Sequence, residues 1–305
     1  MFAEVALNPL GNHGRRRLSS LAGVQDKVLL VRTESGWSEP LDGYPSTHII
    51  KPLAAERTMI FDEEYGSRFA RGLGLASFDT TIETFADVRA LVIQRYDRDQ
   101  SGERSHQEDF NQVLGYRGDE KYEPTQGDGR LRRIAGVLRS NASAEDVRKL
   151  LRMTTLSLAV GNLDMHGKNI SLLHLPGGEI ALAPMYDVVP QLHFEVDKET
   201  ALQINGKADY FSIAGSDLVA EGESWGLRDA RAVVSAALEQ IQEVANREQQ
   251  LPGAHHSLQT TVITQSARLL DGLTHSDSTA PRSAPAPEVF VPRESPGGWG
   301  GPVRP

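Results

Sequence analysis

The chain has no cysteine among its 305 residues, and it has no long apolar segment. Without cysteine, disulfides and thiolate metal sites are excluded, and the composition fits a reducing compartment, so we expect a cytoplasmic protein. No apolar run approaches the ~20 residues that are needed to cross a bilayer. The first 17 residues also lack the apolar core of a secretory signal. We therefore expect a soluble globular protein with no membrane partner.

A surplus of basic residues is also missing. The chain carries 32 Lys and Arg against 41 Asp and Glu, a formal net charge of −9. Proteins that bind nucleic acid through its phosphates usually show a basic surplus or a basic stripe, so we expect no direct nucleic-acid partner. The sequence contains no HExxH motif and no Cys/His cluster, so it gives no support for zinc, and we interpret His48 and His106 as structural residues.

Neither of the common glycine-rich phosphate motifs, GxGxxG and GxxxxGK[ST], is found in the sequence. What precedes the first predicted strand is a turn of small residues that ends at Gly23 and is followed by Val24, Gln25 and Lys27. The backbone N–H groups of such a turn could hold phosphate oxygens. Alone, this segment is weak support for a nucleotide site.

The periodicity of the apolar residues changes along the chain. In residues 18–100, short β-branched runs predict strands at 24–32, 47–53 and 89–97, and a four-residue spacing from Phe61 predicts a helix at 61–75. Helical patterns dominate residues 101–274, which predicts an α+β fold with a cleft where the two parts meet. We interpret residues 1–17 as an arm. The Ser-, Pro- and Gly-rich segment 275–305 is typical of a disordered tail.

Two capping boxes predict helix starts in the second part, one formed by Ser105 with Glu108 and the other by Ser143 with Asp146. The elements expected there are helices at 105–115, 143–162, about 226–248 and about 256–272, and a hairpin of 170–175 with 179–184.

The most informative segment is residues 161–169, a polar stretch between an apolar helix and the apolar hairpin. Asp164 and Asn169 have the Asp-x4-Asn spacing at which phosphoryl-transfer enzymes place a proton-accepting aspartate and a metal-binding asparagine. Asp187 follows 18 residues after Asn169, where kinases hold a second Mg²⁺ ligand. Each of the three could instead be an ordinary turn former, but together they favour metal-assisted phosphoryl transfer.

Lys51 ends an apolar predicted strand, from which its ammonium group could reach ATP phosphates. Glu63 or Glu64 on the following helix could hold this lysine, and we take Glu64 as the supporting residue. A lysine that simply closes an edge strand is the alternative. His166, two residues after Asp164, could orient the loop by hydrogen bonding.

Eight segments, taken in order, resemble the HipA-type serine/threonine kinases of bacterial toxin–antitoxin modules. They are residues 19–27, 47–52, 63–75, 94–98, 106–115, 121–123, 161–169 and 182–189. The resemblance covers residues 18–272, loosely after 190, and implies a two-lobed protein-kinase-like fold with a strand-rich N-lobe (18–100) and a helical C-lobe (101–274).

The resemblance also implies roles for individual residues. Asp164 matches the catalytic aspartate, Asn169 and Asp187 match the Mg²⁺ ligands, and Ser20, with Ser19 beside it, matches a serine that the family autophosphorylates. The ATP-binding candidates are Lys51, Gly23, Val24, Gln25, Lys27, Gln94, Tyr96, His166 and Lys168.

Family members phosphorylate aminoacyl-tRNA synthetases, which arrests translation, and a small helix-turn-helix antitoxin neutralises them. The resemblance thus implies these partners, with ATP and Mg²⁺ as cofactors. Longer members carry a further domain before the phosphate loop, so we expect a truncated chain or a short form completed by a separate small protein. The alternatives are a nucleotide-binding regulator of a repressor complex without turnover, and a kinase of small molecules.

Overall fold

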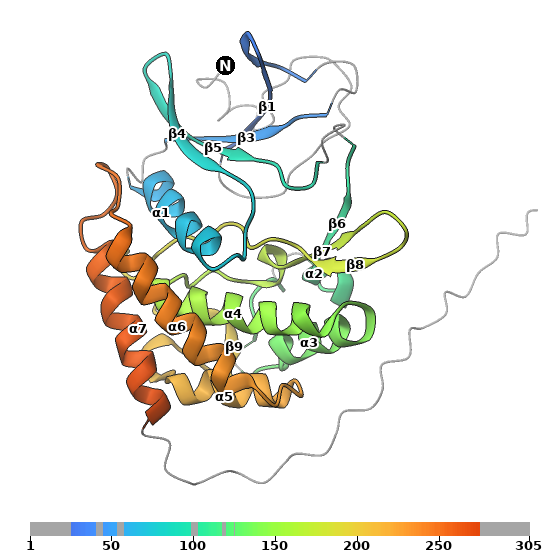
Figure 1. The fold of residues 1–305 in the computed structure, drawn as a ribbon, viewed down its shortest axis with the longest axis vertical. Coiled ribbons are helices and arrows are strands. Elements are labelled where there is room, and N and C mark those ends of the chain that lie inside the picture. Colours follow the sequence, from blue (N-terminus) through green and yellow to red (C-terminus); the bar gives the residue numbers. More distant parts are fainter. Residues whose placement is uncertain are drawn as a thin grey trace, which may run out of the picture. The chain divides into compact units, whose positions relative to one another are not determined.

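A computed structural model describes residues 26–40, 45–53, 58–98, 103–117, 120–124 and 126–274. Within these residues, the N-terminal part forms an antiparallel sheet of five strands in the order β2-β1-β3-β5-β4 (Figure 1). The strands are β1 (Val28–Thr33), β2 (Gly36–Ser38), β3 (His48–Pro52), β4 (Thr80–Phe85) and β5 (Val88–Gln94). The β-branched and leucine side chains of β1, β3 and β5 bury one face of this sheet.

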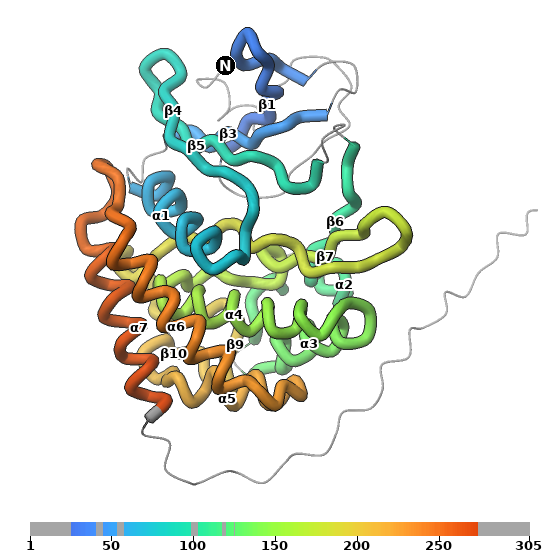
Figure 2. The backbone as a smooth tube through the Cα atoms, in the orientation of Figure 1, coloured from blue at the N-terminus to red at the C-terminus, as the bar shows by residue number. Residues whose placement is uncertain are grey.

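Helix α1 (Met59–Gly72) connects the sheet to the helical part. Near its start, Ile60 and Phe61 pack on the sheet with Leu91, while Tyr65 and Phe69 enter the large core of the helical part. Its end lies beside α6 (Figure 2). There the Gln240 side-chain amide donates to the Gly72 carbonyl at 2.9 Å. One helix therefore contributes apolar side chains to both cores.

The second part is mainly helical, as its sequence pattern predicts. Its helices are α2 (Phe110–Leu114), α3 (Arg130–Asn141), α4 (Ala144–Val160), α5 (Gly215–Ser224), α6 (Ala230–Arg247) and α7 (Leu258–Thr274). Two short sheets accompany them, β6 (His106–Asp109) with β7 (Ser171–His174) and β8 (Ile180–Leu182), and β9 (Glu199–Ile204) with β10 (Lys207–Asp209). Two 3-10 turns, η2 (Gly167–Asn169) and η3 (Tyr210–Ser212), complete it. No helix in the described ranges has the length and apolarity to span a membrane.

Most of the predicted elements are confirmed, including the α+β class, the three strands, α1, the 170–184 hairpin and the two late helices. Helix α4 starts at the predicted capping box, in which the Ser143 hydroxyl accepts from the Asp146 N–H at 3.1 Å. The predicted helix at 105–115 is wrong over its first half, because these residues form β6 and pair with β7. The capping box of α2 lies one turn later, at Asp109 and Gln112.

Candidate functional site

The segment that follows α4 is held by backbone bonds around Asp164. Gly161 caps the end of α4 with a left-handed φ of 73°, and a Cβ atom there would lie 2.5 Å from the Leu192 side chain. The Asp164 carbonyl oxygen then accepts two hydrogen bonds, from the His166 N–H at 2.8 Å and from the Asn169 side-chain amide at 2.9 Å. Because Asn169 donates through its nitrogen, its amide oxygen remains the group that can accept or bind a cation.

Lys51 lies between two carboxylates that come from different parts of the chain. Its ammonium nitrogen is 2.7 and 2.9 Å from the two Glu63 oxygens and 2.6 Å from Asp187 Oδ1. The side chains of Lys51 and Glu63 are buried, whereas 38% of the Asp187 side chain is exposed. The exposed carboxylate is therefore the one that a ligand can reach, and Glu63 holds the lysine from behind.

The backbone at Asp187 has an uncommon conformation. Its φ is 58°, in the left-handed region that aspartate tolerates better than most residues. On the next residue, the Val188 carbonyl lies against Gly66 of α1, so closely that a Cβ at position 66 would be 2.0 Å from its oxygen. The conformation that aims Asp187 at Lys51 thus depends on a glycine in the helix that also carries Glu63. Such outliers are concentrated at functional sites.

Burial and the paired charges shift the pKa values of this site. Burial alone would lower the pKa of Lys51, but Asp187 and Glu63 outweigh it and hold that pKa above its ordinary value, so the lysine is charged. Lys51 lowers the pKa of Asp187, while burial raises the pKa of Glu63 to about 7. Burial, followed by the charge of Lys51, lowers the pKa of Lys27. The site therefore gathers two lysines around a reachable carboxylate.

His166 and Lys121 lie close to Asp164. The His166 ring nitrogen Nε2 is 3.8 Å from Asp164 Oδ2, and its ring meets Tyr122 edge-on at 5.7 Å between centroids. Burial lowers the pKa of His166 despite the nearby carboxylate, so the ring is neutral at neutral pH. Burial opposes charge on Lys121, yet its hydrogen bond to Tyr122 and the charge of Asp164 raise its pKa. A neutral imidazole at this distance fits a loop-orienting role.

A chain of hydrogen bonds connects the end of β5 with the loop that contains Asp164. The Tyr96 hydroxyl donates to Gln107 at 2.9 Å, and the Gln107 amide donates to the Ser171 hydroxyl at 3.0 Å. The Ser171 hydroxyl meets the Tyr186 hydroxyl at 2.6 Å, which donates to the Lys168 carbonyl at 2.8 Å. The Tyr96 and Tyr186 rings stack, with centroids 5.9 Å apart. Side chains from β6, β7 and the segment before Asp187 thus fix the end of β5 relative to the loop that contains Asp164.

The structure brings most of the sequence-predicted site residues together. Lys27, Lys51 and Asp187 interact electrostatically, as do Asp164 and His166, and Asn169 binds the Asp164 carbonyl. Gln94 ends β5, and Tyr96 and Lys168 belong to the chain of hydrogen bonds. The candidates that lie outside the described residues are Ser19, Ser20, Gly23, Val24 and Gln25.

The choice of Glu64 as the supporting residue is wrong in its geometry. Its Oε1 accepts from Arg68 at 2.8 Å, and it is Glu63 that contacts Lys51. Neighbouring residues in a helix point about 100° apart, so only one of the two can face β3.

Sequence reasoning missed Gln107, Ser171 and Tyr186. The signal for Gln107 was hidden because residues 105–115 were interpreted as one helix. Alternation along a strand would have placed Gln107 and His106 on opposite faces.

An antiparallel sheet with one helix, a lysine–glutamate pair, and a loop with aspartate and asparagine followed by a second aspartate define the protein-kinase class of fold. The sequence profile of the HipA-like C-terminal domain matches residues 19–249, and the chain belongs to this family. The two-lobed kinase-like fold is thereby confirmed.

Individual relatives agree with this assignment. A putative kinase, Y4mE of Sinorhizobium fredii, is 35% identical over 61% of this chain and 46% of its own length. The serine/threonine-protein kinase toxin HipA of Shewanella oneidensis is 30% identical over 70% of this chain and 53% of its own. The chain spans about half the length of these curated relatives.

Solved structures show the same fold. HipA of Shewanella oneidensis, in a complex with HipB and its operator DNA, superposes with a TM-score of 0.66 at 25% identity, over 89% of this chain and 69% of that one. The Helicobacter pylori proinflammatory kinase CtkA superposes with a TM-score of 0.52 at 13% identity, over 76% of this chain and 91% of that one, which shows likeness of fold alone.

Proposed function

We propose that this chain is an ATP- and Mg²⁺-dependent serine/threonine protein kinase that acts as the toxin of a toxin–antitoxin module. The observation that carries the proposal is the contact of Lys51 with both Glu63 and Asp187, at 2.6–2.9 Å. The two carboxylates that contact Lys51 are not equivalent, because Glu63 is buried on α1 whereas Asp187 is part-exposed. A kinase needs this division, because Asp187 must turn to a metal ion while Glu63 keeps the lysine in place.

The donor set fits Mg²⁺ bound to ATP. Asp187 and Asn169 would hold the ion, since a part-exposed carboxylate and an amide oxygen are the hard ligands that Mg²⁺ prefers. When bound, Mg²⁺ would neutralise charge on the phosphates. Lys51 would bind phosphate oxygens of the same ATP molecule, and Lys27 would add positive charge near these phosphates. The backbone from Gln94 to Tyr96, at the end of β5, would meet the adenine.

Asp164 has the role of proton acceptor in this proposal. Its carboxylate is part-exposed, at 38%, and its backbone is fixed by the bonds to His166 and Asn169. The hydroxyl oxygen of the substrate would bond to the γ-phosphorus as the bond from that phosphorus to the β–γ bridging oxygen breaks. ADP leaves, and the hydroxyl proton passes to Asp164. The neutral His166 ring would orient the loop.

The substrate and partners that we propose follow from the family. We propose an aminoacyl-tRNA synthetase as the substrate, phosphorylation of Ser20 or Ser19 as self-modification, and a helix-turn-helix antitoxin as the partner. The structure of Shewanella HipA with HipB and operator DNA supports an antitoxin of that kind.

Substitution of Asp164 by glutamine tests the proposal. Loss of the proton acceptor should lower phosphoryl transfer by about 10²–10⁴-fold. Because Lys51, Lys27 and Asp187 all remain in Asp164→Gln, ATP affinity should stay within a few-fold, whereas Asp187→Asn should weaken Mg²⁺–ATP binding as well. Asp87→Asn, an exposed carboxylate in the β4–β5 turn, is the matched control and should change neither quantity.

Labelled ATP mixed with bacterial lysate reports the class of substrate. A labelled protein band, absent with Asp164→Gln, is the expected result. Near-normal transfer by Asp164→Gln would show that the catalytic assignment is wrong. A labelled metabolite without a labelled protein would replace the protein kinase by a small-molecule kinase, and ATP binding without any transfer by the wild type would favour a regulator without turnover.

A further inference from the structure

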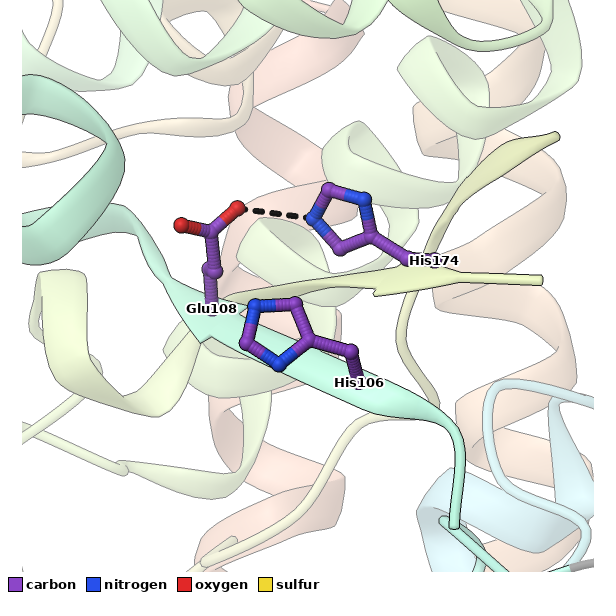
Figure 3. Close-up of side chains that lie close together, drawn as sticks. All are labelled: His106, Glu108 and His174. Carbon is purple, nitrogen blue, oxygen red and sulfur yellow. Dashed lines mark hydrogen bonds and ion pairs between the residues drawn. The ribbon is translucent and has the colours of Figure 1, made fainter. Parts of the chain in front are cut away.

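Two histidines and a glutamate gather on one face of the β6–β7 ladder, the face opposite Gln107. His106 of β6 lies directly opposite His174 of β7, and Glu108 is two residues further along β6, on the same face. The His174 ring nitrogen Nε2 is 2.7 Å from Glu108 Oε2, and the two imidazole rings are 5.0 Å apart (Figure 3). One possible ligand atom from each residue lies within 4.8 Å of the other two.

This arrangement suits a transition-metal ion. Zinc binds imidazole nitrogen and carboxylate oxygen at about 2.0–2.2 Å in a tetrahedral arrangement, which places its ligand atoms about 3.3–3.6 Å apart. The three ligand atoms lie within 4.8 Å of one another, with those of Glu108 and His174 2.7 Å apart, so side-chain rotation, above all of the exposed His106, would bring them to these separations. Two histidines and a glutamate are a known three-ligand set for zinc, with water in the fourth position. Imidazole also disfavours Mg²⁺ relative to Zn²⁺.

The exposure of the three residues gives an ion a route from solvent. The His174 and Glu108 side chains are 37% and 39% exposed, and His106 is exposed. A hydrogen-bonded His–Glu pair alone would account for His174 and Glu108. That pair does not explain why His106 lies directly opposite His174, whereas an ion bound by all three residues would.

We propose that His106, Glu108 and His174 form a binding site for one Zn²⁺ ion, which ties β6 to β7. The β6–β7 ladder connects the first sheet with the loop that contains Asn169, so an ion bound there would affect both. β6 follows the end of the first sheet, and β7 begins two residues after Asn169. Gln107, on the opposite face of β6, belongs to the hydrogen bonds that lead to the Lys168 carbonyl. An ion bound on the face that carries His106 and Glu108 would therefore stiffen the strand pair that supports the hydrogen bonds between Tyr96 and the Lys168 carbonyl.

Calorimetric titration of the full chain with Zn²⁺, in millimolar Mg²⁺ to occupy carboxylate sites, tests the proposal. We expect one ion per chain, a higher melting temperature with Zn²⁺, and an affinity at least tenfold lower in His106→Ala and in His174→Gln. His256→Ala, which removes an exposed histidine outside the cluster, is the matched control and should bind as the wild type does. Co²⁺ in place of Zn²⁺ should give the intense visible bands of a four- or five-coordinate ion in the wild type and in His256→Ala.

The proposal would be wrong if the wild type bound no Zn²⁺ below millimolar concentration, or if His106→Ala bound Zn²⁺ with unchanged affinity. It would also be wrong if His256→Ala lost as much affinity as His106→Ala. Melting temperatures without metal show whether the variants fold. If His106→Ala unfolds, His106→Gln, which keeps a polar side chain on the strand, takes its place, and its Co²⁺ spectrum decides between the outcomes.

Discussion

At Gly66, α1 packs against the carbonyl of Val188, the residue that follows Asp187, and Gly66→Ala tests how tightly the two segments are packed. A Cβ there would be 2.0 Å from the Val188 carbonyl oxygen, and Cβ atoms essentially never lie within 3.0 Å of a heavy atom from another part of the chain. The helix or the segment must therefore shift by about 1 Å. A shift of that size would also separate Asp187 from Lys51.

The size of the effect follows from two opposing terms. Alanine is favoured over glycine within a helix by about 1 kcal/mol. Overpacking of a rigid interior costs about 1–3 kcal/mol or more, and the upper end applies here because Gly66 and Val188 are both buried and the obstacle is backbone. We therefore expect Gly66→Ala to lower the free energy of unfolding by about 2 kcal/mol.

Urea unfolding followed by circular dichroism measures this change. Gly136→Ala in α3 is the matched control, because a Cβ at that helical position would meet nothing within 4 Å. It should raise stability by about 0.4–1 kcal/mol. If Gly66→Ala were as stable as the wild type, or were stabilised as Gly136→Ala should be, the close approach of α1 to Val188 would be refuted.

Two further predictions concern α4 and the lysine pair. Ser143→Ala removes the hydroxyl that accepts from the Asp146 N–H at 3.1 Å, so it should cost about 1 kcal/mol in urea unfolding; a stability equal to that of the wild type would contradict the cap. Because burial raises the pKa of Glu63 to about 7, the folded state holds that proton more tightly than the unfolded state, so the stability of wild type relative to Glu63→Gln should fall as the pH rises from 4.5 to about 7. Urea unfolding of both proteins across this range measures it, and a difference that grows with pH would refute the sign.

Local signals in the sequence predicted those parts of the fold that depend on local interactions. The start of α4 depends on Ser143 and Asp146, which are three residues apart, and both residues were identified. The same pattern at Ser105 and Glu108 was misleading, because the pairing of β6 with β7, more than 60 residues away, outweighs a local cap. The β9–β10 hairpin was missed although Asn205 and Gly206 both adopt positive φ, and Asn-Gly is a strong hairpin signal.

The candidate site shows the same division. The spacing of Asp164, Asn169 and Asp187 was visible in the sequence, and the structure brings Asn169 to the Asp164 backbone. The choice between Glu63 and Glu64 was not visible, since it depends on the rotation of α1 about its axis relative to β3. The cluster of His106, Glu108 and His174 requires the register of two strands, so His106 was interpreted as having no ligand partner.

Strand β6 has four residues, and its two faces carry different groups: Gln107 on one, His106 and Glu108 on the other. Because side chains alternate along a strand, a slip of one residue against β7 would exchange the two faces completely. Substitutions on one face can thus vary independently of the other, whereas a single deletion within β6 would abolish both sets of contacts at once. The strand is tolerant of changes in chemistry and intolerant of changes in length.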